Sequence, residues 1–312
     1  MKTELERHIV WLDCDTGTDD AQAILCANAL PELEIVAISA VAGNVELEKT
    51  YRNALRLNRL MGTDYPVYQG AEKPWLQPQH TGYRYHGENG LGGVELPLPE
   101  NVPETTEKAW DALYEKAKEL GGALEIIATG PLTNIGTALM KYPDLPRFIR
   151  RIVLMGGSAT GGNRTPAAEY NIFADPHAAD AVFRSGIPLV MCGLDVTMQA
   201  IFTEEDLIRI GSKGTPAARL FHDALLTPLR AQEGGEGVKL HDAVAVLYAA
   251  RPELFWGQMA GVAVETRGTV TMGKTVTDLW SDKKFPFKNA FVVLGLDNEA
   301  FVRTVQELIW SY

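Results

Sequence analysis

The chain has 312 residues, of which 46% are hydrophobic, and a formal net charge of -11 at pH 7. This length and apolar content allow a large buried core, while the negative charge argues against nucleic acid or an anionic membrane as partner, because both are bound through basic patches. No stretch approaches the roughly 18 apolar residues of a membrane span, and the charged first seven residues precede too short an apolar run for a signal peptide.

Apolar runs typical of buried strands alternate with helical patterns through the first two thirds of the chain. In chain order, the predicted elements are strand 8–13, helix 20–30, strand 34–41, helix 46–61, helix 105–120, strand 124–128, helix 132–140, strand 152–155, helix 176–183, strand 189–192 and helix 241–250. Three predicted antiparallel strands (262–265, 269–271 and 291–294) and a C-terminal helix follow. This order predicts an α/β fold with a mostly parallel sheet, helices on both faces and a smaller antiparallel addition near the C-terminus.

Two segments interrupt the alternation. Residues 73–100 are rich in Pro, Gly, His and Tyr, and residues 227–238 carry a glycine-rich centre. Loops this long in a compact domain are often lids or binding loops, although a disordered loop tip is an equally open alternative for the second segment.

The cysteines Cys14, Cys26 and Cys192 have no spacing that indicates a disulfide framework or a metal site. Each lies in an apolar segment, so we expect free thiols in a reducing compartment, which for this chain means a cytoplasmic protein. No linker or low-complexity run divides the chain, and residues 1–312 are therefore predicted to form a single domain.

Four aspartates lie within eight residues where the first predicted strand gives way to a helix. They are Asp13, Asp15, Asp19 and Asp20. Like charges this close repel one another, and burial would make them still less favourable, so the cluster indicates a hard metal ion with oxygen ligands. The alternative is a solvated turn with an aspartate as helix cap, which accounts for only one or two of the four.

Polar residues also follow the other predicted strands. They are Asn44, Thr129, Asn134, Asn163, Glu169, Asn171, Asp195, His241 and Asp242. Because ligands of doubly wound sheets bind beyond the carboxyl ends of the strands, we expect these residues to line one site for a hard cation and a polyhydroxy ligand. Capping or turn roles remain an alternative, above all for Asn134. Glu169 and Asn171 lie two residues apart, which on an extended segment would point both side chains the same way.

In their order along the chain, these motifs resemble the inosine-uridine preferring nucleoside hydrolase family. The resemblance is carried by residues 13–21, 43–44, 129–134, 155–157, 163–176 and 241–242. It implies a Rossmann-like fold and the hydrolysis of the N-glycosidic bond of ribonucleosides to ribose and free nucleobase, in purine and pyrimidine salvage. It also implies a tightly bound Ca²⁺ ion and a homodimer or homotetramer.

The same resemblance implies a role for each matching residue. The implied calcium ligands are Asp15, Asp20, Asp242 and the backbone carbonyl of Thr129, with Asp15 also the general base. The implied substrate contacts are Asp19, Asn44, Glu169 and Asn171 at the ribose hydroxyls, Asn163 and Met155 toward the 5′ side, and His86 near the base pocket. His241 matches a leaving-group acid, although the choice between His241 and His86 for that role stays open, and Asp13 orients its neighbours.

One departure and two alternatives qualify the resemblance. Many family members contact the nucleobase through aromatic side chains in the segment before the final His-Asp pair, but residues 223–240 contain none, which leaves the preferred base open. A haloacid-dehalogenase-type magnesium phosphatase would account for residues 13–16 only, without a convincing downstream lysine or second acidic pair. A non-catalytic nucleoside or sugar binder is the other alternative, since fold alone does not confer activity.

Overall fold

Nine strands form one continuous sheet in the computed structural model, which describes residues 7–101, 106–231, 237–280 and 285–312. The strands are β1 (His8–Cys14), β2 (Leu33–Ala40), β3 (Val67–Gln69), β4 (Leu124–Ala128), β5 (Ile149–Met155), β6 (Leu189–Cys192), β9 (Phe255–Val264), β10 (Thr275–Asp278) and β11 (Ala290–Leu296). Their order is β10-β9-β11-β6-β5-β4-β1-β2-β3. Every neighbouring pair from β11 to β3 is parallel, whereas β9 is antiparallel to both β10 and β11. The predicted α/β fold is therefore confirmed.

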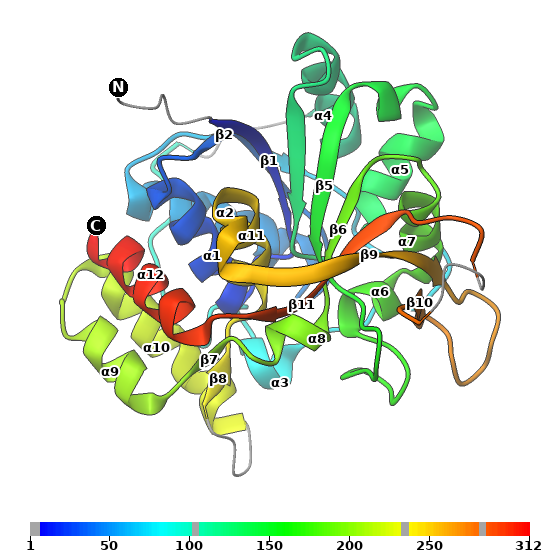
Figure 1. Ribbon diagram of the computed structural model, residues 1–312. Coiled ribbons are helices and arrows are strands. Elements are labelled where there is room, and N and C mark those ends of the chain that lie inside the picture. The colour runs from blue at the N-terminus through cyan, green and yellow to red at the C-terminus, as the bar shows by residue number, and fades with distance from the viewer. Residues whose placement is uncertain (1–6, 102–105, 232–236, 281–284) are drawn as a thin grey trace, which may run out of the picture.

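Helices cover both faces of this sheet (Figure 1). They are α1 (Thr18–Ala29), α2 (Leu47–Met61), α3 (Tyr83–His86), α4 (Ala109–Glu119), α5 (Thr133–Lys141), α6 (Tyr170–Ala174), α7 (Pro176–Phe183), α8 (Leu194–Thr197), α9 (Glu204–Gly211), α10 (Pro216–Ala231), α11 (His241–Ala250) and α12 (Asn298–Trp310). A separate two-stranded ribbon pairs β7 (Ile201–Phe202) with β8 (Val238–Lys239). Within the described ranges, no helix combines the length and apolar character that a bilayer crossing requires.

The alternation of side chains along each strand separates two apolar cores. In β1, Val10 and Leu12 pack into the core shared with α1, α11 and α12, whereas Trp11 packs into the core shared with α4, α5 and α7. Successive strand residues point to opposite faces of a sheet, so a strand such as β6, which is apolar and buried at every position, lies between both helix layers.

The predicted strand at residues 269–271 is wrong. This segment is part of the turn between β9 and β10, and the antiparallel edge strand is Thr275–Asp278. Glu265 accepts hydrogen bonds from the backbone N–H groups of Arg267 and Gly268, which fold the chain back on itself. Val270 is 80% exposed. Valine favours strands because its side chain packs against neighbouring residues there, and at this exposed position it has little to pack against.

The segment 227–238 is only partly irregular. Helix α10 continues through Pro228 to Ala231, and residues 232–236 lie outside the described residues. The hydroxyl of Thr227 donates to the carbonyl of Gly92, which ties this helix to the 73–100 segment. Helices α9 and α10 and the short strand β3 were not predicted from the sequence.

The 73–100 segment contains one short helix, α3, and is otherwise irregular. Polar contacts join it to the body of the protein: the Trp75 indole N–H donates to Thr137, and the Gly82 N–H donates to the carbonyl of Asn44. The second contact places α3, which carries His86, over the end of the sheet at which β1 and β2 finish.

Candidate active site

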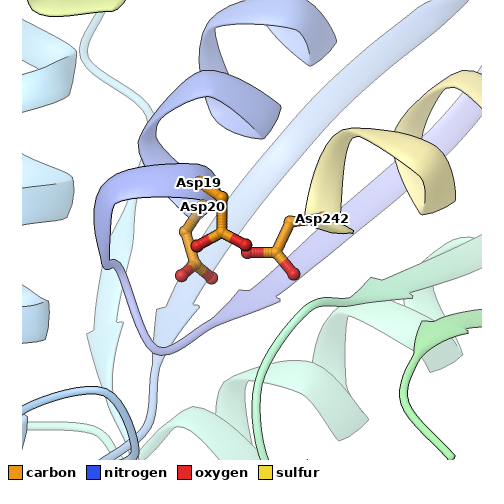
Figure 2. A group of neighbouring side chains, drawn as sticks. All are labelled: Asp19, Asp20 and Asp242. Carbon is orange, nitrogen blue, oxygen red and sulfur yellow. The ribbon is translucent and has the colours of Figure 1, made fainter. Parts of the chain in front are cut away.

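Two helix N-termini bring three acidic side chains to one place at the carboxyl edge of the sheet. Asp19 and Asp20 lie in the first turn of α1, directly after β1, and Asp242 lies in the first turn of α11. Figure 2 shows the three carboxylates pointing toward one another, and each offers an oxygen within 4.8 Å of the others. Residues more than 220 positions apart in the chain thus form a single cluster.

The cluster is buried, and burial dominates its electrostatics. Asp20 is 0% and Asp242 is 3% exposed. Burial raises the pKa of Asp19 and of Asp20, and it raises that of Asp242 well above the usual range, with the neighbouring carboxylates adding to the effect on Asp20 and Asp242. Carboxylates in such surroundings remain ionised only if positive charge is supplied.

Asp15 lies beside this trio, and one of its carboxylate oxygens has no hydrogen-bond partner. Its Oδ2 accepts the backbone N–H of Asn44 at 2.7 Å, whereas its buried Oδ1 has no hydrogen-bond partner. Burial, followed by the charge of Asp20, raises the pKa of Asp15 well above its usual range. An unpartnered buried oxygen next to three further carboxylates fits a hard divalent cation, which prefers oxygen ligands.

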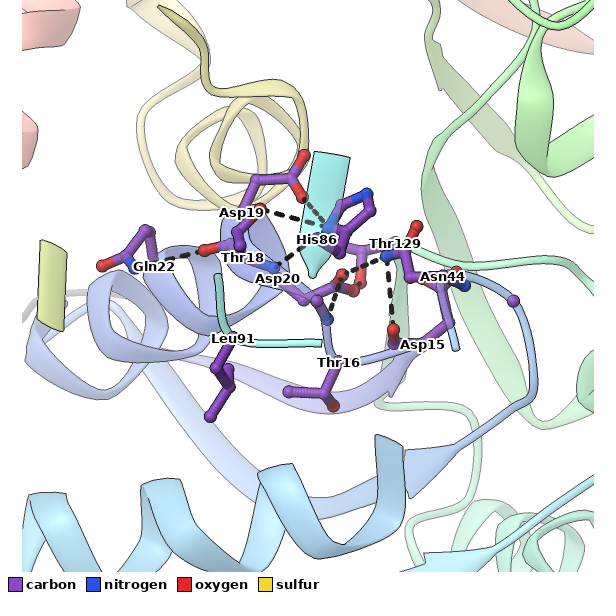
Figure 3. Close-up of polar contacts among 12 residues, drawn as sticks. Asp15, Thr16, Thr18, Asp19, Asp20, Gln22, Asn44, His86, Leu91 and Thr129 are labelled. Atoms are coloured by element: carbon purple, nitrogen blue, oxygen red, sulfur yellow. Dashed lines mark hydrogen bonds and ion pairs between the residues drawn. The ribbon is translucent and has the colours of Figure 1, made fainter. Parts of the chain in front are cut away.

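Neutral donors fix the orientation of the Asp20 carboxylate (Figure 3). The Asn44 amide donates to Asp20 Oδ2 at 2.9 Å and to the Asp15 carbonyl at 3.2 Å. The Thr129 hydroxyl donates to Asp20 Oδ1 at 2.7 Å, and the N–H of Gly17 donates to Asp20 Oδ2 at 2.9 Å. Asp20 therefore has both oxygens directed by neighbours from three segments.

Asp13 supports the site from beneath. Its Oδ1 accepts hydrogen bonds from Ser39 and, at 2.7 Å, from Asn134, while its Oδ2 is buried without a partner. Burial raises the pKa of Asp13 to about 6. Asn134 also accepts the N–H of Ala71 at 2.8 Å, so it links β1 to the loop after β3 and is not a helix cap.

Glu169 and Asn171 do not lie on an extended segment, and the prediction based on that spacing is wrong. Glu169 is the N-cap of α6, and its carboxylate accepts the N–H groups of Gly157, Asn171 and Ile172 at 2.9, 2.8 and 3.1 Å. Burial raises the pKa of Glu169 to about 7. The Asn171 amide instead donates to the carbonyl of Thr129 at 2.8 Å and to that of Met155 at 3.1 Å.

Asn163 and Asp195 lie at the outer part of the same edge. Asn163 is exposed, and its side-chain oxygen accepts the N–H of Tyr170 at 2.9 Å. Asp195 accepts the N–H of Ala159 at 2.7 Å and the Thr160 hydroxyl at 3.0 Å. Asp195 thus holds the loop after β5 and does not join the aspartate cluster.

The two histidines predicted to serve the nucleobase have different partners. His86 Nδ1 lies 3.1 Å from the backbone N–H of Thr18, which can only donate, so we assign the ring proton to Nε2. Burial lowers the pKa of His86 to about 4. His241 Nδ1 lies 2.8 Å from the Thr197 hydroxyl, and burial lowers its pKa while the charge of Asp19 raises it.

Sequence reasoning gave no role to Tyr170, which contacts the loop that carries Asn44. The Tyr170 hydroxyl donates to the carbonyls of Gly43 and His80 at 2.9 and 3.0 Å. Burial and then the charge of Asp15 raise the pKa of this phenol. Its position between Glu169 and Asn171, within the motif at residues 163–176, could have indicated that it lies near the site.

Comparison with known proteins gives matches over nearly the whole chain. The family model of inosine-uridine preferring nucleoside hydrolases matches residues 10–303. A non-specific ribonucleoside hydrolase from Salmonella agona is 43% identical over 301 residues, which cover 96% of this chain and 97% of the relative. A pyrimidine-specific ribonucleoside hydrolase from a Shewanella strain is also 43% identical, over 306 residues that cover 96% of each.

Solved structures agree with these relatives. A purine-preferring ribonucleoside hydrolase from Gardnerella vaginalis is 35% identical, with a TM-score of 0.91 and coverage of 97% of this chain and 98% of that one. An inosine-guanosine nucleoside hydrolase is 27% identical, with a TM-score of 0.90. These matches decide against the phosphatase alternative.

Proposed function

This chain belongs to the inosine-uridine preferring nucleoside hydrolase family and hydrolyses the N-glycosidic bond of ribonucleosides, and we propose that it does so at the aspartate cluster with a bound Ca²⁺ ion. The resemblance read from its motifs is confirmed. The proposed ligands are Asp15, Asp20, Asp242 and the Thr129 carbonyl. The observation that carries the proposal is the unpartnered, buried Oδ1 of Asp15 beside the three clustered carboxylates. When bound there, a calcium ion would act as a Lewis acid and would lower the pKa of an attacking water.

The protein side chains account for the rest of the reaction. The Asp15 carboxylate accepts the proton of the attacking water, whose oxygen bonds to C1′ of the ribose as the bond to the base nitrogen breaks. The neighbouring carboxylates stabilise the positive charge that develops on the sugar, as in other glycoside hydrolyses. His241 gives a proton to the departing base, which balances the reaction.

Substrate binding is assigned to the remaining residues. Asp19, Asn44, Glu169 and Asn171 are proposed to bind the ribose hydroxyls, and Asn163 and Met155 lie toward the 5′ side. With Nδ1 held by Thr18, His86 offers Nε2–H as a hydrogen-bond donor and is proposed to contact the base. Relatives at the same 43% identity are named for different base preferences, so we assign no preferred base.

A nucleoside panel with and without chelator tests the proposal. We expect free base and ribose from inosine, uridine, cytidine or adenosine, loss of activity after chelation, and recovery with Ca²⁺. In parallel, Ca²⁺ should raise the melting temperature of the chelated protein, since a ligand that binds only the folded state stabilises it. Base release that is unaffected by exhaustive chelation would overturn the calcium proposal while leaving the hydrolase activity intact.

Three further properties are proposed with the site. Residues 1–312 form one domain, and the buried free cysteines support a cytoplasmic location. Exposed apolar side chains at the antiparallel edge of the sheet, Trp256 at 57%, Met259 at 47% and Trp280 at 95% exposure, support a homodimer or homotetramer. Light scattering coupled to size exclusion measures the subunit number, and a monomer at micromolar concentration would contradict self-association.

A further inference from the structure

The imidazole of His241 has a buried partner to which the mechanism above gives no role. His241 Nδ1 lies 2.8 Å from Oγ1 of Thr197, which is the last residue of α8 and is 0% exposed. Thr197 comes five residues after the end of β6, whereas His241 opens α11. The contact therefore joins two separate segments at the carboxyl edge of the sheet.

Backbone pairing holds these two segments together. Strands β7 and β8 pair through Ile201 with Lys239 and Phe202 with Val238, and the N–H of Leu240 donates to the carbonyl of Ala200 at 3.0 Å. The bond between Thr197 and His241 extends this ribbon at its end. Because this pairing closely follows Thr197 and directly precedes His241, the Thr197 hydroxyl is well placed to fix the orientation of the ring.

The chemistry of the partner differs between the two histidines. His86 Nδ1 faces both the backbone N–H and the hydroxyl of Thr18 at 3.1 Å, and the N–H can only donate, whereas the partner of His241 Nδ1, the Thr197 hydroxyl, can donate to it or accept from it. The contact to His241 is thus preserved wherever the ring proton lies. In each case Nδ1 is engaged, and Nε2 is the nitrogen left to face a ligand.

We propose that Thr197 is a positioning residue for the hydrolysis, whose hydroxyl orients His241 so that Nε2 serves the leaving nucleobase. The inference rests on the proposed role of His241. Partners that orient metal-binding histidines typically contribute about 10- to 100-fold to activity, and we expect the same range for a partner that orients His241. A purely structural role for this buried hydroxyl predicts instead a loss of stability with no dependence on the leaving group.

Two substrates separate these possibilities: inosine (or, in its place, the nucleoside that the panel shows to be hydrolysed fastest), whose base needs a proton on departure, and a nitrophenyl riboside, whose leaving group does not. We expect Thr197→Val to lower kcat for inosine about 10- to 100-fold with KM changed less than about threefold, and to leave kcat for the nitrophenyl riboside within about threefold. Thr197→Ser retains the hydroxyl and should restore the inosine rate. If the valine variant does not fold, Thr197→Ala carries the same expectation.

Thr50→Val is the matched control. Thr50 is also 0% exposed, and its hydroxyl donates to two backbone carbonyls, those of Val41 and Leu47, at 3.0 Å each. This variant loses a buried hydroxyl outside the aspartate and histidine contacts, so any fall in rate should be equal for both substrates.

A double variant tests whether Thr197 acts through His241. We expect Thr197→Val combined with His241→Ala to be no slower on inosine than His241→Ala alone, because residues that act as a unit are not additive. Equal losses on both substrates with Thr197→Val, an unchanged inosine rate, or failure of serine to restore it would each overturn the inference. If His241→Ala itself slows both substrates equally, the proposed acid role fails and the inference fails with it. If His241→Ala slows inosine alone and Thr197→Val changes neither rate, only the role of Thr197 is overturned.

Discussion

Asp15, Asp19, Asp20 and Asp242 are held close together where water is largely excluded. Such an arrangement opposes folding, since each carboxylate loses hydration and repels the others. The hydrogen bonds from Asn44, Thr129 and Gly17 compensate only part of that loss, and Asp15 Oδ1 has none. Unfavourable contacts of this kind persist at functional sites, where a bound ligand restores the balance.

At Asp15 we expect Asp15→Asn to lower kcat by at least about 10²-fold, because an amide can neither accept the proton of water nor offer a full charge to a cation. Calorimetric titration with Ca²⁺ separates these two losses. Asp195→Asn is the control, since both oxygens of Asp195 are occupied by loop donors and a fall of less than tenfold is expected. Near-normal turnover of Asp15→Asn with Ca²⁺ bound would rule out its role as the base.

At His241 the expected signature is selectivity between leaving groups. His241→Ala should lower kcat for inosine by about 10²-fold or more, as general acid catalysis is typically worth 10²–10⁴-fold. The rate with a nitrophenyl riboside should change little. His222→Ala, which removes a histidine paired with Asp223 on α10, is the control and should affect neither substrate. Equal losses on both substrates with His241→Ala would refute the acid role.

Among the elements, the connection from β1 to α1 does most to build the site. It delivers Asp15 from the strand end and Asp19 and Asp20 into the first helical turn, where the positive end of the helix dipole favours negative charge. The start of α11 presents Asp242 in the same way. The N-termini of two helices thus help to stabilise the clustered carboxylates.

Gly17 is required at this connection by close packing. A Cβ at residue 17 would lie 2.5 Å from His86 Nδ1 and 2.6 Å from Asn44 Nδ2. We expect Gly17→Ala to displace both side chains and to lower kcat/KM by about tenfold or more, since misplacement of about 1 Å can have a 10²-fold effect. Gly161→Ala is the control, because its Cβ would meet nothing nearer than 3.7 Å. Equal activity of the two variants would show that the contacts at Gly17 do not matter.

For the whole molecule, Glu169 should make stability depend on pH. Its pKa is raised from 4.5 to about 7 in the folded protein, so between these values the folded state binds more protons than the unfolded state. The free energy of unfolding therefore falls as pH rises, by up to about 1.4 kcal/mol per pH unit. The stabilising contribution is complete below pH 4.5 and is lost above about pH 7.

Urea unfolding of the chelated protein from about pH 4.5 to about pH 8 measures this slope. Glu169→Gln should be less stable than the wild type at about pH 4.5, because its amide cannot accept all three N–H groups, but it should lack this part of the fall with pH. Glu299→Gln, at an exposed position in α12, should keep the wild-type slope. If Glu169→Gln keeps the wild-type slope as well, Glu169 does not carry the pH dependence.

The sequence alone determined the elements with strong periodicity. It also determined the positions after the strands at which the polar site residues occur. The strand at 189–192 and the helices at 176–183 and 241–250 have the predicted bounds, because continuous apolar runs and helical spacing are local properties of a chain. The aspartate motif is local as well, and it indicated a cation before any fold was known. The prediction of a strand at 269–271 was wrong because these residues are exposed, and exposure depends on the fold and not on the strand preference of the local sequence.

Only the tertiary structure decided which of these residues meet and what each side chain contacts. The trio within 4.8 Å contains Asp19 with Asp20 and Asp242, and Asp15 lies beside it. The Glu169 carboxylate is oriented by the N–H groups of the helix that it caps, and the His241 ring contacts the Thr197 hydroxyl. Distances between segments depend on sheet order and helix packing, which join residues far apart in the chain. The local sequence thus predicts the chemistry present, whereas long-range packing sets the geometry in which it acts.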